Sequence, residues 1–203
     1  MNNAGALLET LQARLLADPP PLVPSRSDFD LNPHVRPAER RELRPSAVLV
    51  PIVLRPEPTV LFTRRSIALR RHAGQVSFPG GAKDSGDASP SATALRELNE
   101  ETGIAPDFVT VAGYLETYET ITGFAVVPVV GLVREGFTLA PDEGEVDDVF
   151  EVPLWFLLDP ANCRIDSREI AGTARRFYVF EYQSHYIWGA TAAMLRMLSG
   201  RLQ

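Results

Sequence analysis

The chain has 203 residues, of which 45% are hydrophobic and 23% are charged, and its formal net charge is -6. These values are those of an ordinary globular protein, so neither disorder nor a fibrous architecture is indicated. The negative charge argues against broad nucleic-acid binding, which usually requires a basic surface. No apolar run reaches the roughly 20 residues of a membrane-spanning helix, and the sole cysteine, Cys163, excludes an internal disulfide. We expect a cytoplasmic protein that contacts neither nucleic acid nor membrane.

The amino-terminal segment is expected to differ from the rest of the chain. Leucines at helical spacing predict an amphipathic helix over residues 4–17. Repeated prolines from Pro19 to Pro37 remove backbone donors and predict an extended arm up to about residue 45. We therefore expect residues 1–46 to pack on a core domain formed by residues 47–203. The arm could cover a pocket, contact a second subunit or cap the core, and the oligomeric state stays open.

The core segment predicts a mixture of strands and helices. β-Favouring runs at 48–54 and 59–65 flank a proline-containing turn, which predicts a β-hairpin. Pro51 cannot donate to a β-ladder, so its strand should have an edge or a bulge there. Further strands are expected at residues 74–78, 108–115, 123–133 and 174–183, and helices at residues 90–102, 153–158 and 188–200. Because these elements interleave irregularly, we expect a mixed β-sheet sandwiched between helices, an α/β (α+β) fold.

The helix expected at 90–102 has both ends marked by backbone chemistry. Ser89 is a good cap, Pro90 suits the first helical position, and Gly103 suits the position just after the last turn. At 100° per residue, the three glutamates of this helix fall within an arc of about 100°. They are Glu97, Glu100 and Glu101.

These glutamates predict either a metal site or a solvated acidic face. Glu97 and Glu101 are four residues apart, so their like charges repel unless a cation lies between them. Mg²⁺ prefers hard oxygen ligands. Two carboxylates are often all that the protein contributes, and water and substrate phosphate complete the coordination. Arg96 precedes Glu100 by four residues and could orient it through a charge-assisted hydrogen bond.

A glycine pair precedes this helix in the run Phe78-Pro79-Gly80-Gly81. Glycine permits positive φ angles and lets backbone amides approach a phosphate closely. We therefore expect a turn here that ends a strand and contacts substrate.

The glycine pair and the helix together resemble the Nudix box, the loop-helix metal site of the Nudix hydrolase family. The residues that carry the resemblance are Gly81, Arg96, Glu97, Leu98, Glu100, Glu101, Gly103 and Ile104. The loop departs from the family pattern, because Asp87 stands where a glutamate is usual and the interval to Arg96 is one residue longer. The resemblance implies a Mg²⁺-dependent (or Mn²⁺-dependent) hydrolase of diphosphate linkages. It also implies Glu97 and Glu101 as the principal metal ligands, with Glu100 assisting as ligand or base.

The segment before the Nudix box is similar to a signature of the coenzyme A pyrophosphatase branch. It runs from Leu61 through Arg64-Arg65-Ser66, Arg70 and Gly74 to the glycine pair. The resemblance implies hydrolysis of coenzyme A or a derivative to 4′-phosphopantetheine and adenosine 3′,5′-bisphosphate. Guanidinium groups bind phosphate bidentately, which gives the arginines a physical role. The expected substrate-binding residues are Arg64, Arg65, Arg70, Arg71, Gly80 and Gly81.

Several residues outside these motifs could have either a structural or a functional role. The family commonly brings a further acid from a later loop to the metal, and Glu145 is our candidate, although a solvated acidic loop would have the same composition. Gly123 and Phe124 form a turn before a strand and could line a nucleotide pocket. His34, His72 and His185 have no ligand or triad spacing and are expected to be structural, while His72 could also help to hold phosphate.

Two alternative functions share these motifs. One is a Nudix hydrolase of another nucleoside diphosphate derivative, such as ADP-ribose, which has no evident use for the upstream arginines. The other is a non-catalytic Nudix module that binds a nucleotide, against which the three retained glutamates argue.

Overall fold

The computed structural model describes residues 3–39, 42–69, 72–170 and 172–203. Its helices are α1 (Asn3–Arg14), α2 (Pro90–Thr102), α3 (Leu154–Leu158) and α4 (Gly189–Leu202), with short 3₁₀ turns at Pro33–Val35, Pro106–Phe108 and Pro160–Asn162. Its strands are β1 (Arg26–Ser27), β2 (Arg44–Val53), β3 (Thr59–Arg65), β4 (Val76–Ser77), β5 (Gly80–Ala82), β6 (Val109–Tyr114), β7 (Tyr118–Glu119), β8 (Phe124–Val133), β9 (Val146–Pro153), β10 (Cys163–Ile170), β11 (Thr173–Tyr182) and β12 (His185–Trp188).

A nine-stranded mixed sheet forms the centre of the fold. Strand β2 pairs in parallel with β8 along its whole length. On its other side it pairs antiparallel with β5 at residues 46–48 and with β3 at residues 52–53. Pro51 lies between these two ladders, so its missing N–H leaves no ladder bond unmade. The expected interruption at Pro51 is thus the point where β2 changes partner.

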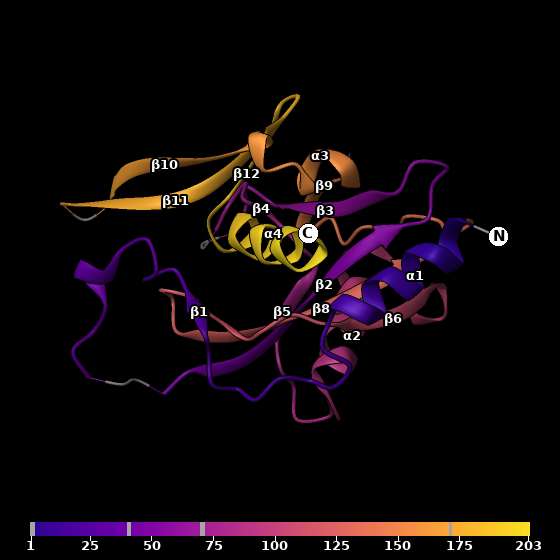
Figure 1. Cartoon of the computed structure of the whole chain (residues 1–203), viewed down its shortest axis with the longest axis horizontal. Coiled ribbons are helices and arrows are strands. Elements are labelled where there is room, and N and C mark those ends of the chain that lie inside the picture. Colours follow the sequence, from indigo (N-terminus) through magenta and orange to yellow (C-terminus); the bar gives the residue numbers. More distant parts are fainter. Residues whose placement is uncertain (1–2, 40–41, 70–71, 171) are drawn as a thin grey trace.

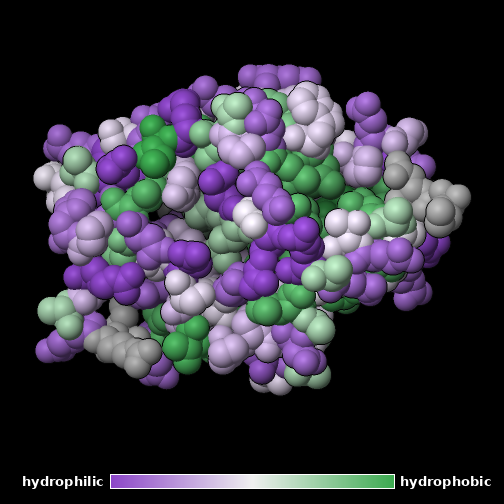
Figure 2. Space-filling model, viewed as in Figure 1, coloured by the Kyte–Doolittle hydropathy of each residue, from purple (hydrophilic) through white to green (hydrophobic). Residues whose placement is uncertain are grey.

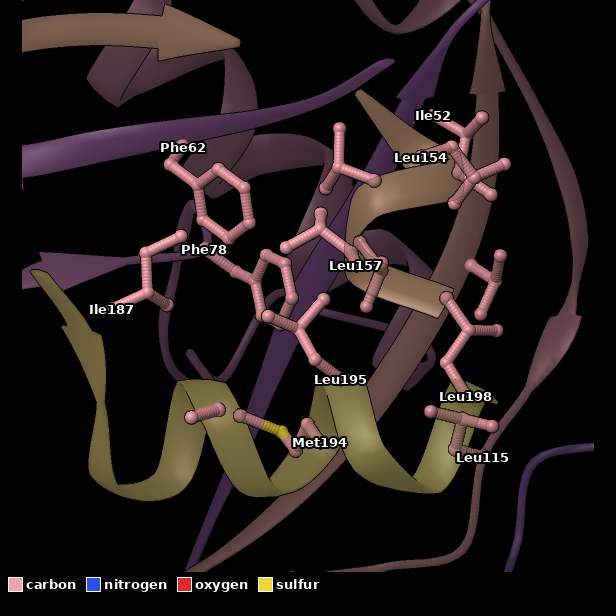
Figure 3. Packing of buried hydrophobic residues seen from close by; sticks show 14 of the residues in the cluster. Ile52, Phe62, Phe78, Leu115, Leu154, Leu157, Ile187, Met194, Leu195 and Leu198 are labelled. Atoms are coloured by element: carbon pink, nitrogen blue, oxygen red, sulfur yellow. The ribbon is translucent and has the colours of Figure 1, made fainter. Parts of the chain in front are cut away.

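Helices cover both faces of this sheet, α2 on one and α4 on the other (Figure 1). Alternate residues of β2 enter two different hydrophobic clusters, because side chains of a strand point to opposite faces in turn. Leu49 packs with Leu98 of α2, whereas Ile52 belongs to the cluster that contains Leu195 of α4. Figure 3 shows Leu195 and Leu198 projecting from α4 into the cluster that contains Ile52. The expected mixed sheet between helices is confirmed.

A second, three-stranded antiparallel sheet is formed by β10, β11 and β12. It lies beside α4, which follows directly from β12 (Figure 1). The prediction at 174–183 corresponds to β11, whereas β9, β10 and β12 were not predicted. The strand expected at 74–78 is wrong in extent, because only residues 76–77 pair with β3.

The amino-terminal segment packs on the core. The helix expected at 4–17 is α1, whose Leu11 is fully buried. The expected extended arm is interrupted by β1, which pairs with β7, and by a 3₁₀ turn at 33–35. Phe29 is also buried, so the arm contributes to the core. Strand β2 begins at Arg44, inside the segment that was expected to be arm.

Hydrophobic residues on the face shown in Figure 2 lie in separate patches among hydrophilic ones. The most exposed large hydrophobic side chains of the described residues include Ile67 and Trp155. None of the described helices combines the length and the apolar character needed to cross a bilayer.

Candidate active site

Helix α2 carries the three glutamates, and local chemistry fixes both of its ends. The Ser89 hydroxyl accepts a hydrogen bond from the Ala92 amide at 3.1 Å, and Pro90 is the first helical residue. Gly103 has a φ of 76°, in the left-handed region, and its N–H donates to the Asn99 carbonyl. The predicted boundaries of the helix are confirmed.

Glu101 lies against β3 and β5 and is only 3% exposed. One carboxylate oxygen accepts from the Thr63 hydroxyl at 3.0 Å and the other from the Gly80 amide at 3.4 Å. Burial raises the pKa of Glu101 to about 7. The two hydrogen bonds and the positive charge of Arg65 lower this pKa but do not cancel the effect of burial. A cation at this carboxylate would favour its charged form.

Glu97 is one turn away and half-buried. Burial raises the pKa of Glu97, opposed by the Arg96 hydrogen bond, while the charges of Glu100 and Glu145 add to the rise. The backbone carbonyl of Glu145 accepts from the Ser66 amide at 2.8 Å, which fixes the start of β9 next to β3. The fold therefore brings Glu145 into the electrostatic environment of Glu97, although its side chain is exposed.

Arg96 connects the helix to the loop that precedes it. Its Nε and Nη2 donate to the two carboxylate oxygens of Asp87 at 3.2 and 3.0 Å, and Nη2 also donates to the Ala82 carbonyl at 3.1 Å. This fork holds the pKa of Asp87 well below its usual range. Nη1 of Arg96 donates to the carboxylates of Glu97 and Glu100, both at 2.8 Å. Asp87 therefore anchors Arg96.

The turn expected at the glycine pair is wrong, because the pair forms a strand. Gly80 and Gly81 belong to β5 and pair with Val48 and Ala47, and neither has a positive φ. They are needed for space instead. A Cβ at Gly80 would lie 2.6 Å from the Ala47 carbonyl oxygen, and a Cβ at Gly81 would overlap the carboxylate of Glu97.

Two of the three glutamates have the chemistry needed to bind a divalent cation. Among the described residues, no three His, Cys, Asp or Glu side chains converge as a metal-holding cluster. Glu97 and Glu101 nevertheless supply two adjacent carboxylates with raised pKa values, and Mg²⁺ commonly takes one or two carboxylates plus water and phosphate oxygens. The pair fits a magnesium site. The Glu100 side chain is 57% exposed and forms an ion pair with Arg96.

A cavity of about 450 Å³ lies next to β5, the strand that contacts these carboxylates. Gly80 and Gly81 form part of its wall, and the same two glycines contact Glu101 and Glu97. Strand β5 therefore borders the cavity and also contacts both carboxylates. Apolar side chains from the sheet and from α4 form much of the lining, and they include Val48, Val76, Phe78, Phe124, Val126 and Met194.

The predicted substrate-binding arginines have different fates. Arg65 lines the cavity. Arg64 forms an ion pair with Asp148 at 3.7 Å and does not line the cavity. Arg70 and Arg71 lie outside the described residues. Phe124 and His72 line the cavity, while His185 stacks on Phe150 with ring centroids 3.5 Å apart.

Other residues of the cavity wall were missed by the sequence analysis. Asp28 and Asn32 come from the amino-terminal arm, so the arm does cover a pocket. Arg175 and Trp188 come from the second sheet. Their neighbours in sequence give no local motif, because the wall is assembled from segments that are distant along the chain.

Comparison with known families decides the class of this site. Residues 43–177 match the model of the NUDIX domain, which covers most of the chain. The chain belongs to the Nudix family. It is similar to a protein of Pectobacterium atrosepticum named uncharacterized Nudix hydrolase NudL, at 42% identity over 183 residues, which are 86% of this chain and 90% of that protein.

Further matches agree with this family. The Escherichia coli protein of the same name is 44% identical over 168 residues, which are 81% of this chain and 88% of that protein. Among solved structures, DR0079 from Deinococcus radiodurans aligns with a TM-score of 0.50 at 16% identity, over 80% of this chain and 86% of that one, and supports the fold. The protein is a Nudix hydrolase, a class that generally uses divalent cations such as Mg²⁺.

Proposed function

We propose that this Nudix hydrolase cleaves the diphosphate linkage of coenzyme A or a derivative, giving 4′-phosphopantetheine (or its acyl form) and adenosine 3′,5′-bisphosphate. The observation that carries the proposal is the glycine wall of β5, which the cavity shares with Glu97 and Glu101. In this proposal the diphosphate lies at β5, between the metal held by the two carboxylates and the cavity that takes the rest of the substrate. The upstream signature, with Arg65 on the cavity lining, supports coenzyme A as the substrate.

Each residue of the site has a role in this proposal. Glu97 and Glu101 hold Mg²⁺ or Mn²⁺, with Glu100 at the edge of the site, and the ion supplies charge neutralisation and activation of water. Arg65 binds diphosphate oxygens. Glu145, or else Glu100, accepts the proton of the attacking water, and Glu145 is near enough for its charge to raise the pKa of Glu97.

A substrate panel tests the proposal. With Mg²⁺ or Mn²⁺, we expect the highest kcat/KM for coenzyme A or one of its oxidised or acyl forms, lower values for 3′-dephospho-coenzyme A, and the lowest for ADP-ribose. Chromatography with mass detection identifies the two products. Faster hydrolysis of ADP-ribose would replace this function with the broader nucleoside diphosphate activity. Nucleotide binding without hydrolysis of any substrate would indicate a non-catalytic module.

A further inference from the structure

Two buried nitrogen atoms on the wall of the cavity lack a hydrogen-bond partner. They are Nε of Arg65 and Nε of Arg175, and no other buried side-chain nitrogen or oxygen of the described residues is unpartnered. Both arginines line the same cavity, although one comes from β3 and the other from β11. A buried donor without an acceptor is costly, so both atoms are expected to find their acceptor in a ligand.

The acidic residue of the lining does not supply that acceptor. Asp28 accepts hydrogen bonds from the Tyr118 hydroxyl at 2.8 Å and from the Ile121 amide at 2.7 Å. By contrast, Arg164 on the same small sheet is paired with Asp166 and Glu181, both at 2.8 Å. Arg175 therefore differs from an ordinary surface arginine of the hairpin.

The backbone on either side of Arg175 is held in place by the amino-terminal arm. Asn32 is buried and bonds Arg176 twice, accepting from its amide at 2.7 Å and donating to its carbonyl at 2.8 Å. A ring nitrogen of His34 lies 3.2 Å from the Ala174 carbonyl oxygen. The arm thus fixes the strand at both neighbours of Arg175, which is the arrangement expected of a preorganised binding group.

The two arginines serve different parts of a ligand. The positive charge of Arg65 acts on Glu101, so Arg65 lies on the side of the scissile linkage. Arg175 belongs to the separate sheet of β10, β11 and β12 and lines the cavity together with Phe177 and Trp188, whose ring centroids lie 4.9 Å apart and which also have the guanidinium of Arg168 5.8 and 5.4 Å from these centroids. This combination of guanidinium and aromatic side chains suits a phosphorylated nucleoside.

We infer that Arg175 is a specificity-determining residue that binds a phosphate monoester of the substrate, remote from the diphosphate that is cleaved. The inference rests on the proposed function in one respect, because it identifies this monoester as the 3′-phosphate of the adenosine moiety. A guanidinium fork binds such a dianion bidentately, and the buried Nε of Arg175 gains an acceptor.

The test compares adenosine 3′,5′-bisphosphate with adenosine 5′-monophosphate, which differ only in the 3′-phosphate and contain no diphosphate to hydrolyse. Isothermal titration calorimetry of the full chain in Mg²⁺ buffer measures both affinities. We expect the wild type to bind the bisphosphate roughly 10- to 100-fold more tightly. Arg175→Gln should lose most of this preference without a change in affinity for the monophosphate, whereas the control Arg164→Gln should keep it.

Several outcomes would overturn the inference. They are a wild type without the preference, an Arg175→Gln variant that retains it, and an Arg175→Gln variant that loses affinity for both nucleotides equally. If Arg175→Gln does not fold, Arg175→Lys decides, because it keeps the charge but lacks the Nε donor. A full wild-type preference in Arg175→Lys then contradicts the inference, and a reduced preference supports it.

This binding test is independent of the proposed hydrolysis. If Arg175 carries the preference but coenzyme A is not cleaved, the proposed function fails and the phosphate subsite stands. If coenzyme A is cleaved and Arg175→Gln leaves the preference intact, the subsite fails and the proposed function stands.

Discussion

Helix α2 and strand β11 differ in how their charged groups are satisfied. On α2, the guanidinium of Arg96 donates to Asp87, Ala82, Glu97 and Glu100, and Glu101 accepts two hydrogen bonds. On β11, Nε of Arg175 is buried without a partner. The charged groups of α2 are satisfied within the protein, whereas Nε of Arg175, like that of Arg65 on β3, is left for a ligand. Changes at α2 should therefore affect turnover or folding, and changes at β11 should affect binding.

The largest effect is expected from Glu97→Gln. The amide keeps the size of the side chain but removes a carboxylate proposed to hold the metal, so kcat should fall roughly 100- to 1000-fold. Steady-state kinetics at saturating Mg²⁺ measures the loss, and circular dichroism should show an intact fold. Glu100→Gln is the comparison, and its exposed side chain predicts a smaller loss. Wild-type turnover in Glu97→Gln would contradict the assignment of Glu97.

The pH dependence of stability should reveal the burial of Glu101. Because its pKa in the folded protein is about 7, above the usual 4.5, the folded state binds more protons than the unfolded state between these values. The contribution of Glu101 to stability is therefore present at acid pH and declines as pH rises through 7, by about 3 kcal/mol. Urea unfolding of the metal-free protein from pH 5 to 8 measures it.

In this experiment Glu101→Gln should remove the decline and exceed the wild type in stability at pH 8. Glu57→Gln, in the exposed turn between β2 and β3, is the control for the substitution itself. Parallel stability curves for the wild type and Glu101→Gln would mean that Glu101 titrates alike in both states.

A methyl group at Gly81 should disturb the carboxylate behind it. The Cβ of Gly81→Ala would overlap the carboxylate of Glu97, which must move aside, so most of the activity should be lost while the free energy of unfolding falls by only about 1 kcal/mol. Gly86→Ala, in the loop that follows β5, is the matched control, because nothing lies within 4 Å of its added Cβ. Thermal unfolding and kinetics measure both variants. Equal behaviour of the two would exclude the steric role of Gly81.

The smallest effect is expected from Asn32→Ala on the arm. The variant loses two hydrogen bonds to Arg176, which should lower stability by about 1 to 2 kcal/mol and weaken the preference for the 3′-phosphate severalfold. Asn162→Ala, which loses a bond to the Phe156 carbonyl away from the cavity, should lower stability without this change in binding. The same calorimetric titration distinguishes them. If Asn32→Ala keeps the full preference for the 3′-phosphate, the arm does not contribute to binding at Arg175.

The sequence predicted α2 accurately because its boundaries depend on neighbouring residues. Ser89, Pro90 and Gly103 act within a turn of their own positions, so no tertiary information is needed. The glycine pair was misread because glycine has two uses, positive φ and close approach, and the second is visible only when Glu97 is in place behind Gly81.

The second sheet was predicted only in part for a similar reason. Strand β10 is mostly exposed, so the apolar alternation that reveals a half-buried strand is missing from it. Arg175 resembles any charged residue in sequence, and its neighbours Ala174 and Arg176 are held by arm residues 140 and 144 positions away. Tertiary contacts of this kind leave no local pattern.

The hydrogen bonds between Arg96 and Asp87 also explain how the site accommodates the extra residue in the loop before α2. Because Arg96 holds both Asp87 and the Ala82 carbonyl, the two ends of the loop at residues 83–88 are tied to the helix whatever the chain does between them. Exposed residues such as Gly86 lie in this span, where an added Cβ meets nothing. Insertions and deletions there should be tolerated, so the spacing of the motif can drift while its glutamates keep their positions.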